Sequence, residues 1–515
     1  MPDPTRIATA RIINTNMLWI NKHQNVQQQC KRICSIDLPP EDDSGNNILN
    51  DMAACATALQ GVLRDAIAAG VSLRCTGGTW SLSDAAATDG WLIDTLSMNL
   101  YWTMGKKQVS TNYTKDRKGL FLFQGGVTVQ DVNTYAEERK RALSTSGASN
   151  GQTIAGAIAT GTHGSAFKYG SMTEFVVGLY LVTAPDKAIW LERASYPVIS
   201  DAFAAQLGVE LKRDDALFNA ALVSFGSFGI VAGVMIETVP IYTLACKRVL
   251  MDLDAPLKNA MNTMDFSALG IDPGVPELKH FEVTFNPHDA SKGFVRTMHV
   301  NDYPTNYTAP VLEDGELGPG QGLLEIIGTV TTVGGPAVVA LAITQLMKTT
   351  LEITPDPPPP PTTPGDTFPV TTLRGKAMSM ELGISVENSV TVLELILGLD
   401  PNVLGVYAGV ISFRWVKQSS ATLGFTKFPV TTTIEFNAAN NARTLAFYNL
   451  LWKELGNRGI PYTLHWGQMH NFTPELVRQM YGTSVDDWMA SRAALLDADC
   501  RKVFSNAFLE ATGLG

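Results

Sequence analysis

Basic residues are outnumbered in this 515-residue sequence, which has 39 lysines and arginines against 49 aspartates and glutamates. The formal charge of −10 and the isoelectric point near 5.3 leave no excess of positive charge. A protein that binds nucleic acid usually needs a basic stripe to contact the phosphates, and no such stripe is visible here. We therefore expect no nucleic-acid partner.

Cysteine is also sparse, and its spacing does not match that of small disulfide-rich domains. Cys30 and Cys34 would share one face if their segment were helical, but no second pair has the spacing of zinc ligands. We therefore expect most of them to be buried thiols and we expect no metal site. The six cysteines are Cys30, Cys34, Cys55, Cys75, Cys246 and Cys500.

The amino terminus lacks the continuous apolar run behind basic residues that marks a secretory signal, so we expect a cytoplasmic protein. One internal stretch, Ile326 to Met347, has no charged residue and is long enough to span a membrane. Three threonines and the break Gly334-Gly335-Pro336 divide it into a strand-like and a helix-like half. We expect a buried or interface helix there and no integral membrane segment.

The length of the chain favours two domains, because single cores rarely grow past roughly 250–300 residues. Apolar periodicity predicts a helix from Ile48 to Ala69 and another from Val129 to Arg141. Phe175 to Val182 is typical of a buried strand, and Leu217 to Val239 of a helix or strand that ends the first domain. Beyond Ile241 alternating strands such as Lys279 to Phe285 and Thr431 to Phe436 predict an antiparallel sheet. Surface breaks are expected at 39–45 and in the polyproline run 356–361.

A glycine-rich loop, Thr76-Gly77-Gly78-Thr79-Trp80-Ser81, lies between two short predicted strands, Val71 to Arg74 and Trp91 to Asp94. Small residues let successive backbone N–H groups close on an anion, as in a diphosphate cradle. A Gly-Gly pair between strands is more often a simple turn, so this loop alone decides nothing.

A second run of small residues, Ser146 to Ser165, strengthens the interpretation of the first loop. It contains five glycines, with Thr153, Thr160 and Thr162 as hydroxyl donors between them. Two such runs in one chain are hard to explain as turns. They predict a binding site for a phosphate-bearing cofactor.

The second run includes Gly156-Ala157-Ile158-Ala159-Thr160-Gly161-Thr162-His163-Gly164-Ser165. With this motif the sequence resembles the vanillyl-alcohol oxidase (PCMH-type FAD-binding) flavoprotein superfamily, in its aldonolactone and alditol oxidase branch. Further matches are Trp19 with Asn21, the segment Val223 to Ile230, and His465-Trp466-Gly467. The matches follow the order of the family along nearly the whole chain.

The resemblance implies an α+β fold of two domains. Residues 1–242 would form the FAD-binding domain and 243–449 a substrate-binding cap on an antiparallel sheet, and 450–515 would return to the FAD domain. The residues expected to bind FAD are Thr76, Gly77, Gly78, Thr79, Trp80, Ser81, Ser146, Gly147, Thr153, Gly156, Thr160, Gly161, Thr162, His163, Ile230 and Val231.

The resemblance also suggests catalytic residues, namely Arg414, His465, Gln468 and Glu435. Arg414 aligns with an arginine that helps polarise the substrate or stabilise the reduced flavin, although a cap salt bridge is an equally good explanation. His465 ranks first as a base, ahead of His470, Glu435 and Glu282. The chain departs from the family at Ser412, where relatives often have glutamate, and at Gln468, where they have lysine.

The function implied is oxidation of an alcohol group of a sugar, lactone, sterol-like or other secondary-metabolite substrate, with oxygen or another electron acceptor. The alternatives are an oxidative tailoring enzyme of the berberine-bridge type and a flavin-binding protein without turnover. Trp80 stands where relatives have the histidine that bonds covalently to the flavin, and 148–152 contains no cysteine. Because the indole nitrogen has no free lone pair, we expect FAD to be bound without a covalent link.

Overall fold

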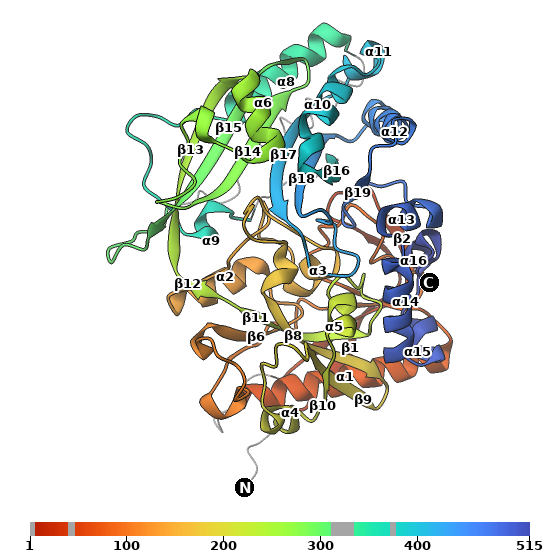
Figure 1. Ribbon diagram of the computed structural model, residues 1–515. Helices are drawn as coiled ribbons and strands as arrows, with labels where there is room; N and C mark the ends of the chain where they lie inside the picture. Colours follow the sequence, from red (N-terminus) through yellow and green to blue (C-terminus); the bar gives the residue numbers. More distant parts are fainter. Residues whose placement is uncertain (1–5, 40–46, 311–333, 371–376) are drawn as a thin grey trace.

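The computed structural model describes residues 6–39, 47–310, 334–370 and 377–515. Two groups of elements lie one above the other in Figure 1, with a seven-stranded sheet in the upper half and a four-stranded and a six-stranded sheet in the lower half. The predicted break at 39–45 lies almost wholly outside the described residues, as does the 326–333 part of the uncharged stretch.

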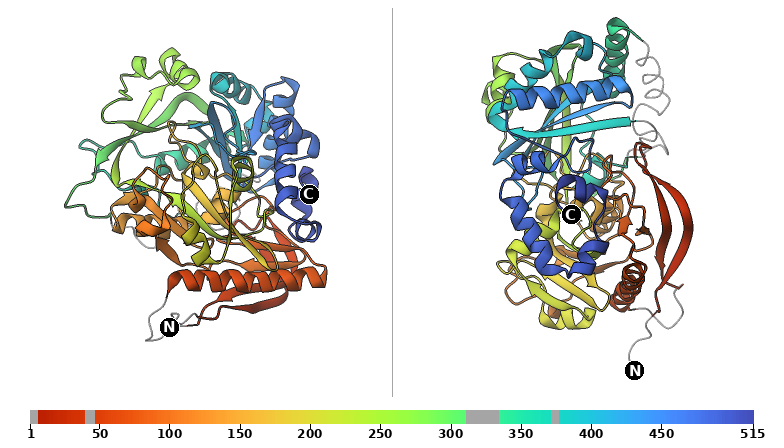
Figure 2. Two further views of the ribbon diagram at one scale, coloured as in Figure 1. Left: turned by 60° about the horizontal axis from the view of Figure 1, so that its bottom comes forward. Right: turned by 90° about the vertical axis from the view of Figure 1, so that its right-hand side faces the viewer.

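The amino-terminal sheet has the strand order β1-β2-β4-β3. β1 and β2 form an antiparallel hairpin, and β4 pairs parallel to both β2 and β3. The long helix α1 connects β2 to β3 and runs beside the hairpin (Figure 2). The elements are β1 (Thr9–Ile20), β2 (Gln27–Asp37), α1 (Ile48–Ala69), β3 (Leu73–Thr76) and β4 (Trp91–Asp94).

Local chemistry fixes the ends of α1, which are those predicted. Asn47 precedes the helix and its side chain accepts hydrogen bonds from the backbone N–H groups of Leu49 and Asn50. Gly70 ends the helix in the left-handed region with φ 63°, where glycine carries no steric penalty. Cys30 and Cys34 lie on β2 and are therefore not on a helix, and all six cysteines are free thiols.

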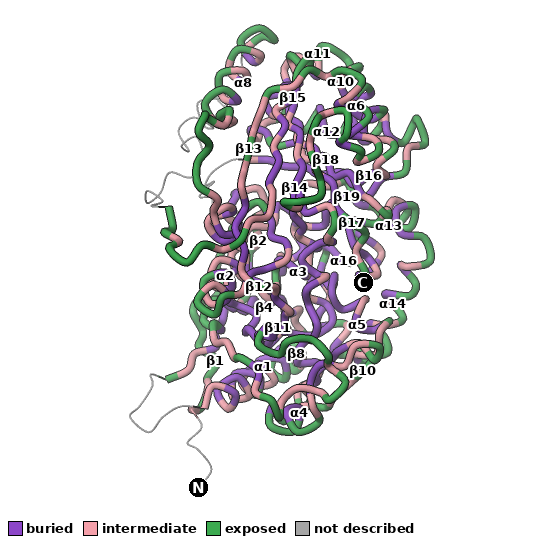
Figure 3. Tube along the Cα trace, turned by 60° about the vertical axis from the view of Figure 1, so that its left-hand side comes forward, coloured by how far each residue is buried: buried purple, intermediate pink, exposed green. Residues whose placement is uncertain are grey.

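The six-stranded sheet has the order β10-β9-β8-β11-β6-β5. Along β8, Leu179 and Leu181 pack toward one core, whereas Tyr180 and Val182 pack toward the core that contains α1. Both faces of β8 are therefore buried (Figure 3), which explains the continuous apolar run predicted as a buried strand. The strands are β5 (Tyr101–Thr103), β6 (Leu120–Gln124), β8 (Val176–Ala184), β9 (Lys187–Glu192), β10 (Glu210–Arg213) and β11 (Ile230–Glu237).

Four helices accompany this sheet, and two sequence predictions need correction here. The helices are α2 (Val129–Glu138), α3 (Ile154–Ala159), α4 (Asp201–Leu207) and α5 (Asp215–Leu222). α2 ends before Arg141, which lies in the short strand β7 (Arg141–Ala142) paired with β12 (Val239–Pro240). The segment 217–239 is not one element, because the loop between α5 and β11 has positive φ at Phe225, Gly226 and Gly229, which neither a helix nor a strand allows.

The seven-stranded sheet has the order β13-β15-β14-β17-β18-β16-β19, and every neighbouring pair is antiparallel, as predicted. One face packs against α6, α10 and α12 in the main core (Figure 1). The strands are β13 (Tyr242–Asp252), β14 (Leu278–Asn286), β15 (Asp289–Asp302), β16 (Ala377–Ser385), β17 (Gly409–Lys417), β18 (Val430–Ala439) and β19 (Tyr462–Leu464).

The helices of this half are α6 (Ala255–Thr263), α8 (Pro336–Thr350), α9 (Pro364–Thr367), α10 (Ser389–Leu397), α11 (Pro401–Leu404) and α12 (Ala442–Asn457). α8 packs through Val339, Ile343 and Met347 onto a small cluster with Ala408 and Ala439. In the part of the chain that is described, no helix has both the length and the apolar character needed to cross a membrane. The polyproline run after α8 is mostly exposed, as predicted.

The carboxyl-terminal helices follow β19 and lie beside the lower half of the molecule (Figure 1). Trp488 donates from Nε1 to the carbonyl of Val223 at 2.9 Å, and Arg492 donates to the carbonyl of Ser227 at 3.0 Å. These helices are α13 (Pro474–Tyr481), α14 (Ser484–Leu495), α15 (Ala498–Val503) and α16 (Ala507–Thr512). The division into 1–242, 243–449 and 450–515 stays a prediction, since β19 pairs within the upper sheet whereas α14 packs on α5.

Candidate flavin site and reaction site

The first glycine-rich loop leaves β3 and meets the second small-residue run. A Cβ atom on Gly77 would lie 2.2 Å from Oγ1 of Thr153, and one on Gly78 would lie 2.6 Å from the carbonyl oxygen of Gly151. Both contacts are too short for any side chain. The two loops are therefore in direct contact, and glycine is needed at both positions because of that contact.

The turn between β1 and β2 holds the first loop in place. Asn21 donates from Nδ2 to the carbonyl of Ser81 at 2.8 Å, and Asn25 donates to the carbonyl of Leu82 at 2.7 Å. The backbone N–H of Lys22 donates to the carbonyl of Thr79 at 3.0 Å. The amino-terminal hairpin is thus part of the cradle.

Trp80 lies between the hairpin turn and the second run. The ammonium of Lys22 is 3.4 Å from the centre of the indole, a cation–π contact. On the other side, a Cβ atom at Gly151 would come within 2.4 Å of the indole ring. Gly151 is therefore required by the size of Trp80. His23, whose ring centre is 6.1 Å from that of Trp80, contributes to the same wall.

A cavity of about 610 Å³ runs from these loops to the open face of the seven-stranded sheet. Of the residues predicted to bind FAD, Gly147, Gly161 and Ile230 do not line it. Gly161 turns the backbone with φ 75°, and Ile230 is buried opposite Val182 in the sheet. The predicted residues that do line it are Thr76, Gly77, Gly78, Thr79, Trp80, Ser81, Ser146, Thr153, Gly156, Thr160, Thr162, His163 and Val231.

Arg414 on β17 faces the cavity among three carboxylates from three other strands. Its guanidinium lies 2.6 Å from Glu435, 3.5 Å from Glu381 and 3.9 Å from Glu282. Burial alone would lower the pKa of Arg414, but the three carboxylates outweigh burial and raise it. The charge of Arg414 is therefore permanent, and an oxygen atom in the cavity can bind to it.

Two histidines complete the charged cluster. His163 donates from Nδ1 to the carbonyl of Gly164 at 2.9 Å and places Nε2 3.1 Å from Glu381. Burial lowers the pKa of His163, but Glu381 raises it further, so the net shift is upward. Burial likewise disfavours the charged form of Glu381, yet His163, His465 and Arg414 lower its pKa to about 2. The two form a buried ion pair.

His465 has the opposite character. Its Nδ1 accepts the backbone N–H of Gly467 at 3.0 Å, so the hydrogen of the neutral ring is on Nε2. Burial lowers the pKa of His465 to about 4, which keeps the ring neutral. The arrangement makes His465 a hydrogen-bond donor, whereas the sequence analysis ranked it first as a base.

His163, Glu381 and His465 offer ligand atoms within 4.8 Å of one another, close enough for a metal ion. A metal at Nε2 of His465 would have to displace the hydrogen that the contact with Gly467 places there. That conflict favours a proton-carrying cluster, and the absence of a metal remains a prediction.

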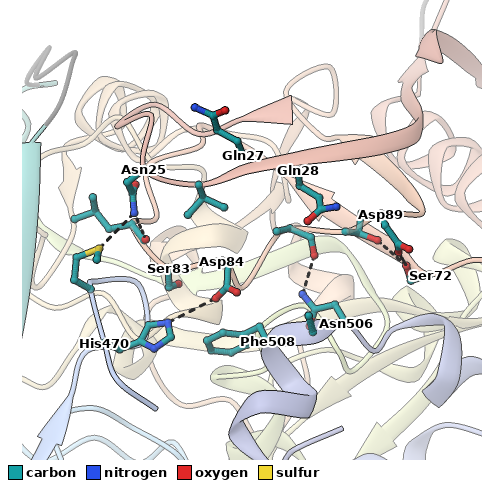
Figure 4. A pocket seen from close by; sticks show the side chains of 16 residues that line it. Asn25, Gln27, Gln28, Ser72, Ser83, Asp84, Asp89, His470, Asn506 and Phe508 are labelled. Carbon is teal, nitrogen blue, oxygen red and sulfur yellow. Dashed lines mark hydrogen bonds and ion pairs between the residues drawn. The ribbon is translucent and has the colours of Figure 1, made fainter. Parts of the chain in front are cut away.

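The two other candidate residues near the His-Trp-Gly motif, Gln468 and His470, line different cavities. Gln468 lines the cavity, and its buried Oε1 accepts no hydrogen bond from the residues that the structure describes. His470 lies 3.6 Å from Asp84 beside a second cavity of about 660 Å³, behind the first loop (Figure 4). His470 is thus apart from the charged cluster.

Sequence reasoning missed Glu381 and His23. Glu381 is the one charged residue of β16, a strand that is otherwise small and apolar, and an isolated carboxylate in such a strand is a usable signal. His23 has no comparable signal, because it follows the Trp19 and Asn21 match in a polar turn.

Comparison with known proteins supports the same cofactor. A family model described as an FAD binding domain matches residues 52–192, which include both loops. L-gulono-1,4-lactone dehydrogenase of Mycobacterium tuberculosis is 28% identical over 244 residues, 47% of this chain and 47% of that protein. D-arabinono-1,4-lactone oxidase of Debaryomyces hansenii is 27% identical over 196 residues, 37% of this chain and 31% of that protein. The match thus spans less than half of either relative.

Solved structures match over nearly the whole length. The crystal structure of cholesterol oxidase from B. sterolicum covers 99% of this chain and 99% of its own, with a TM-score of 0.69 and 14% identity. A solvent-stable cholesterol oxidase covers 98% of both chains, with a TM-score of 0.68 and 13% identity. Identities this low establish the fold alone. The chain therefore contains an FAD binding domain, with FAD as its cofactor, and its fold is that of these flavoprotein oxidases.

Proposed function

We propose that this protein is an oxidoreductase that uses FAD to oxidise an alcohol carbon to a carbonyl, with oxygen as the electron acceptor. The observation that carries the proposal is the single cavity that joins the two glycine-rich loops to the buried cluster around Arg414. The lactone-oxidising activities named for the relatives agree with this reaction class.

The residues of the chain have separate tasks in such a reaction. Bound FAD supplies the hydride-accepting atom. Arg414 binds the substrate oxygen and stabilises the negative charge that develops there. Glu435 takes the hydroxyl proton, because its carboxylate contacts Arg414 at the cavity surface whereas Glu381 is committed to His163. His465 donates its Nε2 hydrogen to an oxygen or nitrogen acceptor in the cavity.

The missing glutamate at Ser412 does not remove the carboxylate from this site. Glu435 is the direct cross-strand neighbour of Ser412, and Glu381 is in turn the neighbour of Glu435. Cross-strand neighbours have Cβ atoms about 4.5–5.5 Å apart, so a glutamate on β18 reaches the space served by one on β17. This replacement supports turnover over the alternative of a flavin-binding protein without activity.

The oxidative tailoring alternative has less support. The berberine-bridge type would place a cysteine within 148–152, and this segment contains none. We also propose an intracellular site, because all six cysteines are free thiols.

An aerobic assay of the purified yellow protein tests the proposed reaction. Polyols, sugar lactones, sterols and long-chain alcohols would be added singly, and flavin bleaching and peroxide would be recorded. At least one alcohol should bleach the flavin and yield peroxide. Bleaching by dithionite but by no alcohol would refute the function while leaving FAD binding intact.

We further propose that FAD is bound without a covalent bond. Trp80 fills the position of the family's attaching histidine, and burial raises the pKa of the neighbouring Cys75 to about 12, so its thiol is not a nucleophile. Acid precipitation should leave FAD in the supernatant and the protein at its unmodified mass. Because His23 also lines this wall, a flavin-sized mass increment that disappears in His23→Ala would overturn the proposal and identify the attachment site.

A further inference from the structure

The cavity changes character along the open face of the seven-stranded sheet. On β17, Arg414, Ser412 and Val410 alternate with buried core residues and face the cavity. From Arg414 to Val410 the strand advances about 13 Å. Along this distance the lining passes from a guanidinium to a hydroxyl and then to an isopropyl group.

The far end of the cavity is lined by the carboxyl-terminal turn of α8 and by small residues of the sheet. Its lining contains one amide, Asn437, and the hydroxyl groups of Ser379 and Thr350. The other side chains there are apolar or absent, namely Leu346, Leu351, Met378, Ala408, Gly409 and Ala438.

Charge is confined to the opposite end. The carboxylates and guanidinium of the cluster lie on the rows of the sheet that include Arg414 and Ser412, as their cross-strand pairing shows. Among the described lining residues beyond Val410, none is ionisable. A molecule that fits both ends has one polar group at Arg414 and an apolar body toward α8.

A polyol or sugar fits this lining poorly. Each of its hydroxyl groups would lose hydrogen bonds to water at the α8 end and find few partners there. A hydrocarbon body instead gains from leaving water, in proportion to the apolar area buried. The polarity of the cavity therefore selects against the carbohydrate alternatives left open by the sequence.

We propose that the substrate is a lipophilic secondary alcohol, with its hydroxyl at Arg414 and Glu435 and its hydrocarbon body between Val410 and α8. The proposal rests on the function proposed above. Bound FAD would accept the carbinol hydride, and the carboxylate of Glu435 would take the hydroxyl proton, which would give a ketone. Oxygen then takes the two electrons and two protons to form hydrogen peroxide, so that alcohol plus oxygen yields ketone plus peroxide.

The test uses the full-length protein with its FAD and compares three donors in stopped-flow reduction under anaerobic conditions. The donors are alkan-2-ols of increasing length, a sterol carried by cyclodextrin, and a sugar set of galactitol and a gulonolactone. The apparent KM of the alkanols should fall about fourfold with each added methylene until the far end is full. Saturation by the sterol rather than by any linear chain would identify a rigid polycyclic body instead of a flexible one.

A higher kcat/KM for the sugar set than for every lipophilic alcohol would overturn the inference and leave the proposed function standing. If no donor reduces the flavin, the proposed function fails. Titration with a long methyl ketone, followed by the flavin absorbance, then tests the apolar site independently of turnover. A saturable spectral change supports the site, and its absence overturns it.

A pair of variants on one helix separates binding from folding. Leu346→Gln places an amide in the apolar end, and Leu341→Gln changes a residue of α8 that is 71% exposed and outside the cavity. Leu346→Gln should raise the KM of the longest alkanol about tenfold and leave that of the shortest unchanged, whereas Leu341→Gln should change neither. An equal rise for short and long alcohols in Leu346→Gln would count against the assignment.

Discussion

The two ends of the cavity are built on different principles. The end toward the glycine-rich loops is made of backbone N–H groups, hydroxyls and glycines whose side chains are absent because the loops touch. The end toward the seven-stranded sheet holds four charged side chains and two histidines supplied by separate strands and loops. One end depends on close approach of the chain to itself, and the other on balance between buried charges.

This difference predicts which property of the protein is lost when a residue at each end is substituted. Enlarging a residue at the loop end should cost cofactor binding, since nothing there can move without separating the loops. Removing Arg414 at the sheet end should cost reaction rate, since Arg414 is the group proposed to stabilise the charge that develops on the substrate oxygen. Variants at the two ends are therefore expected to have separable effects.

The largest effect is expected for Arg414→Ala. The substitution leaves Glu282, Glu381 and Glu435 buried without the cation that they surround. The rate of flavin reduction should fall about 10²- to 10³-fold in rapid mixing, by analogy with the loss of one group that stabilises developing charge. FAD content should be unchanged.

The exposed pair of Arg478 with Asp486 provides the control for that variant, and Arg478→Ala should leave the rate unaltered. Equal reduction rates in Arg414→Ala and the unaltered protein would remove Arg414 from the reaction site. Loss of FAD from Arg414→Ala would instead show that the two ends are not separable.

The loop end is tested by Gly77→Ala. The added methyl group would lie 2.2 Å from Oγ1 of Thr153, so the two loops must separate. We expect FAD affinity to fall by about tenfold or more, measured by flavin fluorescence after dialysis, since a forced contact costs on the order of 1–3 kcal/mol. Gly61→Ala on α1, where nothing lies within 4 Å, is the matched control and should bind FAD normally. Normal FAD affinity in Gly77→Ala would show that the close approach is not needed.

A third test compares the histidines at the two ends through the pH dependence of unfolding. Burial lowers the pKa of His23 at the loop end and of His465 at the sheet end to about 4. Each therefore stabilises the fold above the unfolded pKa of 6.5, and this stability is lost as the pH falls toward 4. Between pH 7 and pH 5.5 each histidine should lower the free energy of unfolding, measured in urea, by about 1.2 kcal/mol.

In His23→Asn and in His465→Asn, the decrease in the free energy of unfolding between pH 7 and pH 5.5 should be smaller by about that amount. His163 has the opposite sign, because its raised pKa contributes stability that is present below pH 6.5 and lost as the pH rises through the folded value. His163→Asn should therefore lose more stability at pH 6 than at pH 9. Unaltered pH profiles in His23→Asn and His465→Asn would show that neither ring is held neutral by burial.

The smallest effect concerns the support of Trp80. Lys22→Met removes the cation over the indole and should lower the free energy of unfolding by about 0.5–1 kcal/mol, with a small loss of FAD affinity. Arg32→Met removes a similar cation–π contact, in which the guanidinium carbon lies 3.8 Å from the centre of the Trp91 ring. Neither residue belongs to the glycine-rich loops. Arg32→Met should match the loss of stability without any change in FAD affinity. A change in FAD affinity shared by both variants would count against a local role for Lys22.

The sequence revealed the loop end because its determinants are local. The spacing of glycines and threonines in 76–81 and 146–165 indicates which backbone positions must lack a side chain. The ends of α1 were equally predictable, since Asn47 and Gly70 are strong cap residues. The break at 223–229 was missed because the apolar composition continues across it, and only positive φ angles at Phe225 and its neighbours separate helix from strand.

The sheet end was only partly predictable, because its determinants are cross-strand neighbours. Arg414 was found by alignment, but Glu381 is 33 residues away and comes beside it only through the pairing of β16, β18 and β17. The role of His465 depends on which ring nitrogen Gly467 contacts, which residue types do not specify. The register of these strands and the tautomer of His465 are set only in the folded chain, so residue types alone do not predict them.

The contacts of Arg74 join the first glycine-rich loop to residues that are synthesised much later. Its guanidinium, at the base of the first loop, donates to four carbonyl groups in three segments, those of Ala85, of Phe225 with Gly226, and of Phe504. Asn506 adds two further bonds to Ala85 and Ala87. A chain still on the ribosome has both glycine-rich runs long before it has residue 504. The base of the cradle therefore gains these contacts only after residues 504 to 506 have been synthesised, long after the two loops that it supports.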